Sequence, residues 1–139
     1  MKDFAGTWSL ARRTLDAAGA ETARFTGRAV FAPEGTALAY RESGALEMAS
    51  GRFEANQMHV WRQDGPRICV SFADGRPFHC FATGTVTAGA LHQCPPDLYR
   101  VEYDFGDWPV WRSDWTVTGP RKDYVLRSEY RRSTETGTD

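Results

Sequence analysis

Three segments near the C-terminus decide the fold expected for this chain: LYRVEYDF (98–105), VWRSDWTV (110–117) and DYVLRSEYR (123–131). In each of them, aromatic or apolar residues alternate with charged residues. In the second segment, Trp111 and Trp115 share one face and Arg112 lies on the other. A period of two residues is typical of β-strands, whose successive side chains point to opposite faces. The segments are therefore predicted to be strands, and the pattern leaves open which face is the inner one.

Turn signals recur about every ten residues through the rest of the chain. Asp64-Gly65 and Asp74-Gly75 are the strongest, because Asp-Gly readily adopts the backbone angles of tight hairpins. Ser43-Gly44 is a further predicted turn. Strands are expected between the turns, at 7–15, 23–32, 36–42, 45–49, 52–63, 67–73, 77–82 and 85–93.

About ten short strands in one domain must stack as two sheets or close on themselves. Closure removes exposed strand edges, so we predict an all-β fold, a closed antiparallel β-barrel of about 8–10 strands spanning residues 1–132. A short helical turn at 2–5 leads into the first strand, and residues 15–20 form a hairpin loop. The polar tail, residues 133–139, is predicted to be disordered.

Composition excludes several classes of partner. The chain has 139 residues, with 17 basic and 18 acidic side chains and a net charge of −1, which argues against binding a nucleic-acid polymer. No apolar run approaches the ~20 residues of a membrane-spanning helix, so we expect no membrane partner. The first residues lack a signal-peptide core, which predicts a cytoplasmic location.

The three cysteines, Cys69, Cys80 and Cys94, form no Cys-x-x-Cys pair, and their odd number agrees with a reducing compartment. We expect small buried side chains that need no disulfide. The alternative is a zinc site built from Cys80, Cys94, His79 and His92, but their spacing matches no standard zinc motif. We therefore predict no metal and no cofactor.

Two resemblances point to a family. Gly6-Thr7-Trp8 resembles the Gly-x-Trp motif of the calycin (lipocalin-like) superfamily, which implies that Trp8 plugs one barrel end against Arg127 or Arg131. A longer resemblance, densest over 72–132, is to a bacterial family of lipocalin-like domains of unknown function. Its motifs here include FADGRPFH (72–79), PDLYRV (96–101) and GPRKDY (119–124). This resemblance implies the fold and brings no established activity.

The aromatic residues indicate a pocket. Five Trp, five Tyr and eight Phe are present, and twelve of them lie between Trp61 and Tyr130. The leading hypothesis is a barrel that binds a small, partly apolar, anionic metabolite. Its walls are predicted to be Trp61, Tyr99, Tyr103, Trp111, Trp115, Tyr124 and Tyr130. Its polar anchors are predicted among Arg76, His79, His92, Arg112, Lys122 and Arg127.

Two other functions stay open on the sequence. The first is an enzyme of the isomerase or hydrolase type that uses His79 or His92 as a general base in the same pocket. The second is a protein-interaction module, in which an exposed aromatic patch at Trp108-Pro109-x-Trp111 pairs with a second copy of the chain or with another protein.

Overall fold

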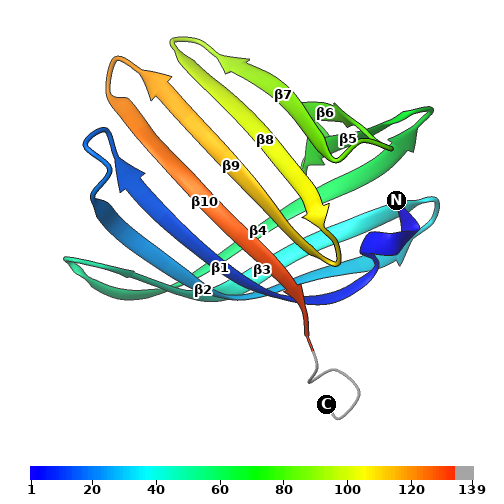
Figure 1. Ribbon diagram of the computed structural model, residues 1–139, viewed down its shortest axis with the longest axis horizontal. Helices are drawn as coiled ribbons and strands as arrows, with labels where there is room; N and C mark the ends of the chain where they lie inside the picture. The colour runs from blue at the N-terminus through cyan, green and yellow to red at the C-terminus, as the bar shows by residue number, and fades with distance from the viewer. Residues whose placement is uncertain (134–139) are drawn as a thin grey trace.

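The computed structural model describes residues 1–133 and consists of one 3-10 helix followed by ten strands (Figure 1). These elements are η1 (Lys2–Phe4), β1 (Gly6–Asp16), β2 (Glu21–Glu34), β3 (Ala37–Met48), β4 (Gly51–Asp64), β5 (Arg67–Phe72), β6 (Pro77–Ala82), β7 (Thr87–Cys94), β8 (Asp97–Asp107), β9 (Val110–Gly119) and β10 (Lys122–Arg132). The predicted all-β fold and the short N-terminal helical turn are confirmed. So are the hairpin loop after β1 and the turns at Asp64-Gly65 and Asp74-Gly75.

All ten strands belong to one antiparallel sheet in the order β6-β5-β4-β3-β2-β1-β10-β9-β8-β7. Pairing of β1 with β10 joins the first strand to the last, and the sheet curls into a barrel (Figure 1). The sheet's end strands, β6 and β7, contact each other, but no hydrogen-bonded ladder joins them within residues 1–133. The barrel is therefore nearly closed, not fully closed as the sequence predicted.

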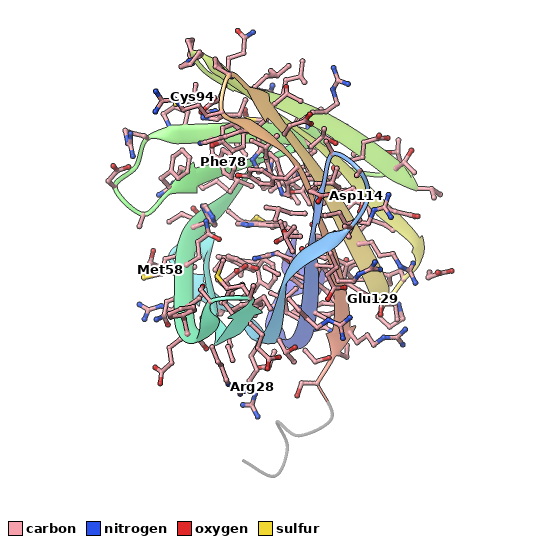
Figure 2. All side chains as sticks on the ribbon, turned by 90° about the vertical axis from the view of Figure 1, so that its left-hand side faces the viewer. Arg28, Met58, Phe78, Cys94, Asp114 and Glu129 are labelled. Carbon is pink, nitrogen blue, oxygen red and sulfur yellow. A yellow bond between two sulfur atoms is a disulfide. The ribbon has the colours of Figure 1, made fainter. Side chains whose placement is uncertain are left out.

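The structure shows which face of each alternating strand points into the barrel. In β9, Trp111, Ser113 and Val117 are buried, whereas Arg112 lies on the outer face. The aromatic face of these strands points inward because it removes the larger apolar area from water. On the outer face of the sheet, Arg28 of β2 and Met58 of β4 project away from the barrel (Figure 2).

The turn predicted at Ser43-Gly44 is wrong. Ser43-Gly44 does not separate two strands but lies inside the single strand β3, where Gly44 pairs with Gly27 of β2. The two backbones approach so closely here that a Cβ atom at Gly27 would lie 2.1 Å from the carbonyl oxygen of Ser43. Glycine in this strand therefore marks a close approach between strands instead of a turn.

Aromatic packing closes one end of the barrel around Trp8. The Trp8 indole nitrogen donates to the Phe4 carbonyl oxygen over 2.9 Å, and the guanidinium carbon of Arg132 lies 3.9 Å from the Trp8 ring centroid. Arg132 also donates to the backbone carbonyls of Asp3 and Ala5. The resemblance predicted the Trp–Arg contact correctly but assigned it to the wrong arginine. Arg127 and Arg131 lie on the exposed face of β10 and pair with the carboxylates of Asp114 and Glu129.

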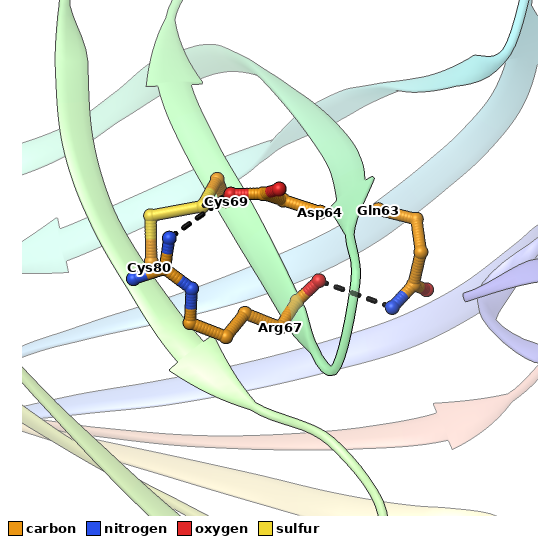
Figure 3. The surroundings of a disulfide bond; sticks show 5 residues. All are labelled: Gln63, Asp64, Arg67, Cys69 and Cys80. Atoms are coloured by element: carbon orange, nitrogen blue, oxygen red, sulfur yellow. Dashed lines mark hydrogen bonds and ion pairs between the residues drawn. A yellow bond between two sulfur atoms is a disulfide. The ribbon is translucent and has the colours of Figure 1, made fainter.

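The sequence predicted that the cysteines are buried and form no disulfide, and both expectations are wrong. Cys69 and Cys80 lie opposite each other on β5 and β6 and form a disulfide (Figure 3). Cys94 is a free, exposed cysteine. The disulfide takes Cys80 out of the zinc alternative. In the described part of the chain, no group of three or more His, Cys, Asp or Glu residues could hold a metal ion. The disulfide also removes the cysteine pattern as an argument for a cytoplasmic location.

Two further expectations concern membranes and the tail. None of the helices in residues 1–133 has the length and apolar character needed to cross a membrane. The predicted disordered tail, 133–139, lies outside the described residues except for Ser133, whose backbone N–H donates to the Thr7 carbonyl oxygen over 3.1 Å.

Candidate ligand-binding cavity

The barrel interior contains a cavity of about 260 Å³. Its lining combines aromatic rings with a small number of polar groups, and it comes from both halves of the chain. The lining residues are Arg12, Tyr40, Glu42, Gln57, His59, Trp61, Val70, Phe78, His79, Tyr99, Tyr103, Trp111, Ser113, Trp115, Val117, Tyr124, Leu126 and Tyr130.

The cavity becomes more exposed with distance from the end that Trp8 plugs. Tyr40, Trp61 and Tyr130 are buried, whereas Tyr99 and Tyr124 are half-buried at the far end. An apolar cavity that is closed at one end and accessible at the other is typical of small-molecule sites.

Eight of the thirteen residues predicted from the sequence line this cavity. They are Trp61, His79, Tyr99, Tyr103, Trp111, Trp115, Tyr124 and Tyr130. The Trp111 and Tyr130 rings stack with their centroids 3.8 Å apart, and the Phe78 and Trp115 rings stack at 4.9 Å. Stacked planar walls of this kind are suited to flat, apolar groups.

Three of the predicted cationic anchors lie outside the cavity, which corrects the sequence-based assignment. Arg76 lies beside the β5–β6 turn, where it pairs with Asp74 over 2.7 Å. Arg112 and Arg127 occupy the outer faces of β9 and β10. Because their strands' aromatic residues face inward, the alternation carries these arginines outward.

The other two predicted anchors lie near the open end without lining the cavity. The Lys122 ammonium donates to the Tyr99 hydroxyl over 2.9 Å and lies 3.1 Å from an Asp97 carboxylate oxygen. His92 packs its ring against Phe78, with centroids 5.1 Å apart. Lys122 therefore already has a carboxylate partner.

The main polar group of the cavity was missed by the sequence analysis. Arg12 of β1 and Glu42 of β3 form a two-pronged ion pair, with nitrogen–oxygen distances of 2.6 and 3.1 Å. Between them on the inner face of β2 lie the small residues Gly27 and Ala29, which leave room for the long Arg12 side chain to reach across. The Arg12 side chain is 18% exposed and that of Glu42 is 5% exposed, so the pair lies in a largely water-free environment.

Hydroxyl groups complete the hydrogen bonding of this pair. Arg12 Nε donates to Ser128 Oγ over 2.7 Å, and the Tyr40 hydroxyl donates to Glu42 Oε1 over 2.5 Å. Tyr40 Oη also lies 3.0 Å from Tyr130 Oη. Because the single hydroxyl proton of Tyr40 goes to the carboxylate, Tyr130 is the donor to Tyr40.

The ion pair controls the protonation of its members. Burial alone would raise the pKa of Glu42, but the hydrogen bonds and charge of Arg12 lower it below its ordinary value. Burial alone would lower the pKa of Arg12, whereas interactions with Tyr130 and Glu42 raise it. Burial raises the pKa of Tyr40 and Tyr130. At neutral pH the pair is therefore ionised and the tyrosines hold their protons.

The two histidines of the cavity are uncharged at neutral pH. His79 Nε2 lies 2.8 Å from the Tyr103 hydroxyl oxygen, and burial lowers the pKa of His79 to about 3. Burial also lowers the pKa of His59, which the sequence analysis did not select. His59 stacks on Phe78 with ring centroids 5.4 Å apart.

The missed residues had a signal in the alternation. Arg12 has the same parity as Trp8 and Leu10 in its strand, and Glu42 the same parity as Leu38 and Tyr40. A charged residue on the apolar face of a strand is a candidate for a buried polar site. The full set of lining residues that the prediction omitted is Arg12, Tyr40, Glu42, Gln57, His59, Val70, Phe78, Ser113, Val117 and Leu126.

The aromatic patch proposed for protein interaction is only partly on the surface. Trp111 is fully buried, and Trp108 is 40% exposed. Trp108 packs its ring on Trp8 and Phe4, at centroid distances of 5.6 and 5.2 Å. Trp108 therefore contributes to the plugged end of the barrel, and Trp111 belongs to the cavity wall.

Comparisons with known proteins agree with the fold. The S-type phycobiliprotein lyase CPES from Guillardia theta has a similar structure, with a TM-score of 0.64 at 9% sequence identity. The similarity covers 94% of this chain and 88% of the lyase. At this identity the likeness supports the lipocalin-like fold. No curated protein matches the sequence. Residues 4–132 match a family described as a family of unknown function, and the chain therefore belongs to this family, DUF6314.

Proposed function

We propose that this barrel binds one small, largely apolar molecule in its interior cavity. The observation that carries the proposal is the combination of aromatic walls with the buried group formed by Arg12, Glu42, Tyr40 and Tyr130. Burying several polar residues is costly in a protein that needs only a packed core. A cavity with a small number of ordered polar groups orients a bound molecule, which supports a binding role.

The two histidines predicted as general bases are unsuited to that role, which favours binding over catalysis. His92 does not line the cavity, and a histidine with a pKa of about 3 is a weak base at neutral pH. A general base works best when its pKa lies near the operating pH. The isomerase or hydrolase alternative therefore loses both of its proposed bases. The structurally similar protein is named a lyase, but the histidines of this chain supply no base for such a reaction.

Isothermal titration calorimetry with three naphthalene probes of matched shape tests the proposal. The probes are naphthalene-2-carboxamide, 2-naphthoate and 2-naphthylmethylamine, which differ in charge. We expect at least one of them to bind with a stoichiometry of one. Leu126→Trp replaces an aliphatic lining residue by a bulky indole that fills the cavity, so it should abolish this binding.

Val125→Trp is the matched control, because Val125 is adjacent in sequence and lies on the opposite face of β10. It should leave binding unchanged. If none of the three probes binds, or if the two tryptophan variants behave alike, the interior is not a binding site and the proposal fails.

A further inference from the structure

The cavity contains two opposite charges that neutralise each other. Among its eighteen lining residues, Arg12 and Glu42 carry the ionised side chains, and the two guanidinium–carboxylate contacts of 2.6 and 3.1 Å join them directly. A two-pronged contact of this kind satisfies both groups in charge and in geometry. The net charge presented to a bound molecule is therefore zero.

The hydrogen bonds around Glu42 leave little of the carboxylate for a ligand. Oε1 accepts from Arg12 Nη2 and from the Tyr40 hydroxyl, and Oε2 accepts from Arg12 Nη1. On the arginine, Nε donates to Ser128, and Nη1 and Nη2 each donate one N–H to Glu42. Beside the paired charges lies the neutral Tyr130 hydroxyl, which donates to Tyr40 and whose oxygen also interacts with Arg12.

The other residues of the lining add no charge. His59 and His79 are neutral because burial lowers their pKa values. The arginines predicted as anion anchors lie outside the cavity, and Lys122 near the open end has Asp97 as its partner. An ion entering the cavity would lose its hydration without gaining a free counter-charge, and this loss is costly in an apolar site.

We propose that Glu42 determines the specificity of the cavity: by neutralising Arg12, it makes the barrel select uncharged aromatic molecules and exclude carboxylates of the same shape. This inference rests on the proposed binding function and deepens it. It replaces the anionic ligand expected from the sequence. Removing the Glu42 charge should therefore uncover a buried cation and so create an anion site.

The test compares naphthalene-2-carboxamide with 2-naphthoate at pH 7.5 by calorimetry. In the unaltered protein, the carboxamide should bind at least tenfold more tightly than the carboxylate. In Glu42→Gln, the affinity for 2-naphthoate should rise at least tenfold, because Arg12 then lacks its counter-charge. The glutamine keeps one acceptor oxygen for Tyr40 and Arg12 Nη2, whereas its amide nitrogen cannot accept from Arg12 Nη1, which leaves that N–H free for the ligand's carboxylate.

Glu129→Gln is the matched control. It removes the same charge from the outer face, where Glu129 pairs with Arg112 and Arg131. It should change neither affinity. If Glu42→Gln does not fold, the double variant Arg12→Met/Glu42→Gln removes both charges and should keep the preference for the carboxamide.

The outcomes separate the two proposals. If no probe binds to the unaltered protein, the binding function itself fails. If 2-naphthoate binds as tightly as the carboxamide or more tightly, or if Glu42→Gln leaves their ratio unchanged, the barrel still binds a ligand but Glu42 does not set its charge preference.

Discussion

Replacing Arg12 by methionine should destabilise the protein in a way that depends on pH. Arg12 and Glu42 are a largely buried pair, and removing one partner leaves the other charge buried and uncompensated. Breaking such a pair typically costs about 3–5 kcal/mol. Since a domain is usually stable by about 5–15 kcal/mol, this loss is large but leaves a folded population to measure.

The direction of the pH dependence follows from Glu42. In the unaltered protein its folded pKa is lowered, so its stabilising contribution is present above the unfolded value of 4.5 and is lost as the pH falls through the folded value. Without Arg12, burial dominates and raises the folded pKa of Glu42 above 4.5. The variant then loses stability as the pH rises through 4.5, at about 1.4 kcal/mol for each unit of pKa difference.

Urea unfolding followed by tryptophan fluorescence measures both effects. We expect Arg12→Met to lose about 3–5 kcal/mol at pH 7.5 and about 1–2 kcal/mol at pH 4, where Glu42 is protonated. The double variant Arg12→Met/Glu42→Met should recover most of the loss at pH 7.5. Arg127→Met, which removes an exposed arginine 3.8 Å from Asp114, should change stability by less than about 1 kcal/mol.

Two results would refute this reasoning. The first is a loss in Arg12→Met that has the same size at both pH values, since it would mean that lost packing and not a buried charge is responsible. The second is a double variant no more stable than the single one. Urea m-values that match the unaltered protein are needed to show that the denatured states are comparable.

Three further predictions test the fold and the cavity. Gly27→Ala should destabilise by about 2 kcal/mol or more in urea unfolding because its Cβ would lie 2.1 Å from a backbone oxygen, whereas Gly89→Ala, with 3.5 Å of clearance, should have little effect. Arg132→Met should cost about 1–3 kcal/mol in the same assay, since it loses the contact with the Trp8 ring and two hydrogen bonds to backbone carbonyls. The NMR signals of the His79 ring should not titrate between pH 7 and pH 5, and an NMR titration midpoint near 6.5 would contradict the burial of His79. Because the folded pKa of about 3 lies below the unfolded value of 6.5, the free energy of unfolding should fall as the pH drops below 6.5.

Period-two alternation made the aromatic wall predictable. In 98–105, 110–117 and 123–131, it grouped Tyr99 with Tyr103, Trp111 with Trp115, and Tyr124 with Tyr130, and all six line the cavity. The pattern could not choose the inner face, because both faces of a strand have the same period. The comparison of buried apolar area makes that choice, and it also explains why Arg112 lies outside.

The disulfide was within reach of the sequence. The predicted turn at Asp74-Gly75 centres a hairpin whose register places Cys69 directly opposite Cys80, five residues away on each side. The odd number of cysteines obscured this pair, because Cys94 is the unpaired one. The mistake at Ser43-Gly44 has a different cause: its close approach to Gly27 depends on the pairing of β2 with β3, which no local signal reveals.

The Arg12–Glu42 pair was the hardest feature to predict, since the chain has fifteen arginines and one of them alone carries little information. Predicting the pair requires knowing that Arg12 and Glu42 lie on the inner faces of β1 and β3. It also requires knowing that the small residues of β2 lie between them. The pair also links stability to specificity, because the same contacts neutralise the cavity and hold three strands together. These roles separate in the double variant Arg12→Met/Glu42→Met. Since it removes both charges at once, it should regain stability at pH 7.5 while still preferring the uncharged naphthalene probe, whereas Glu42→Gln alone should change that preference.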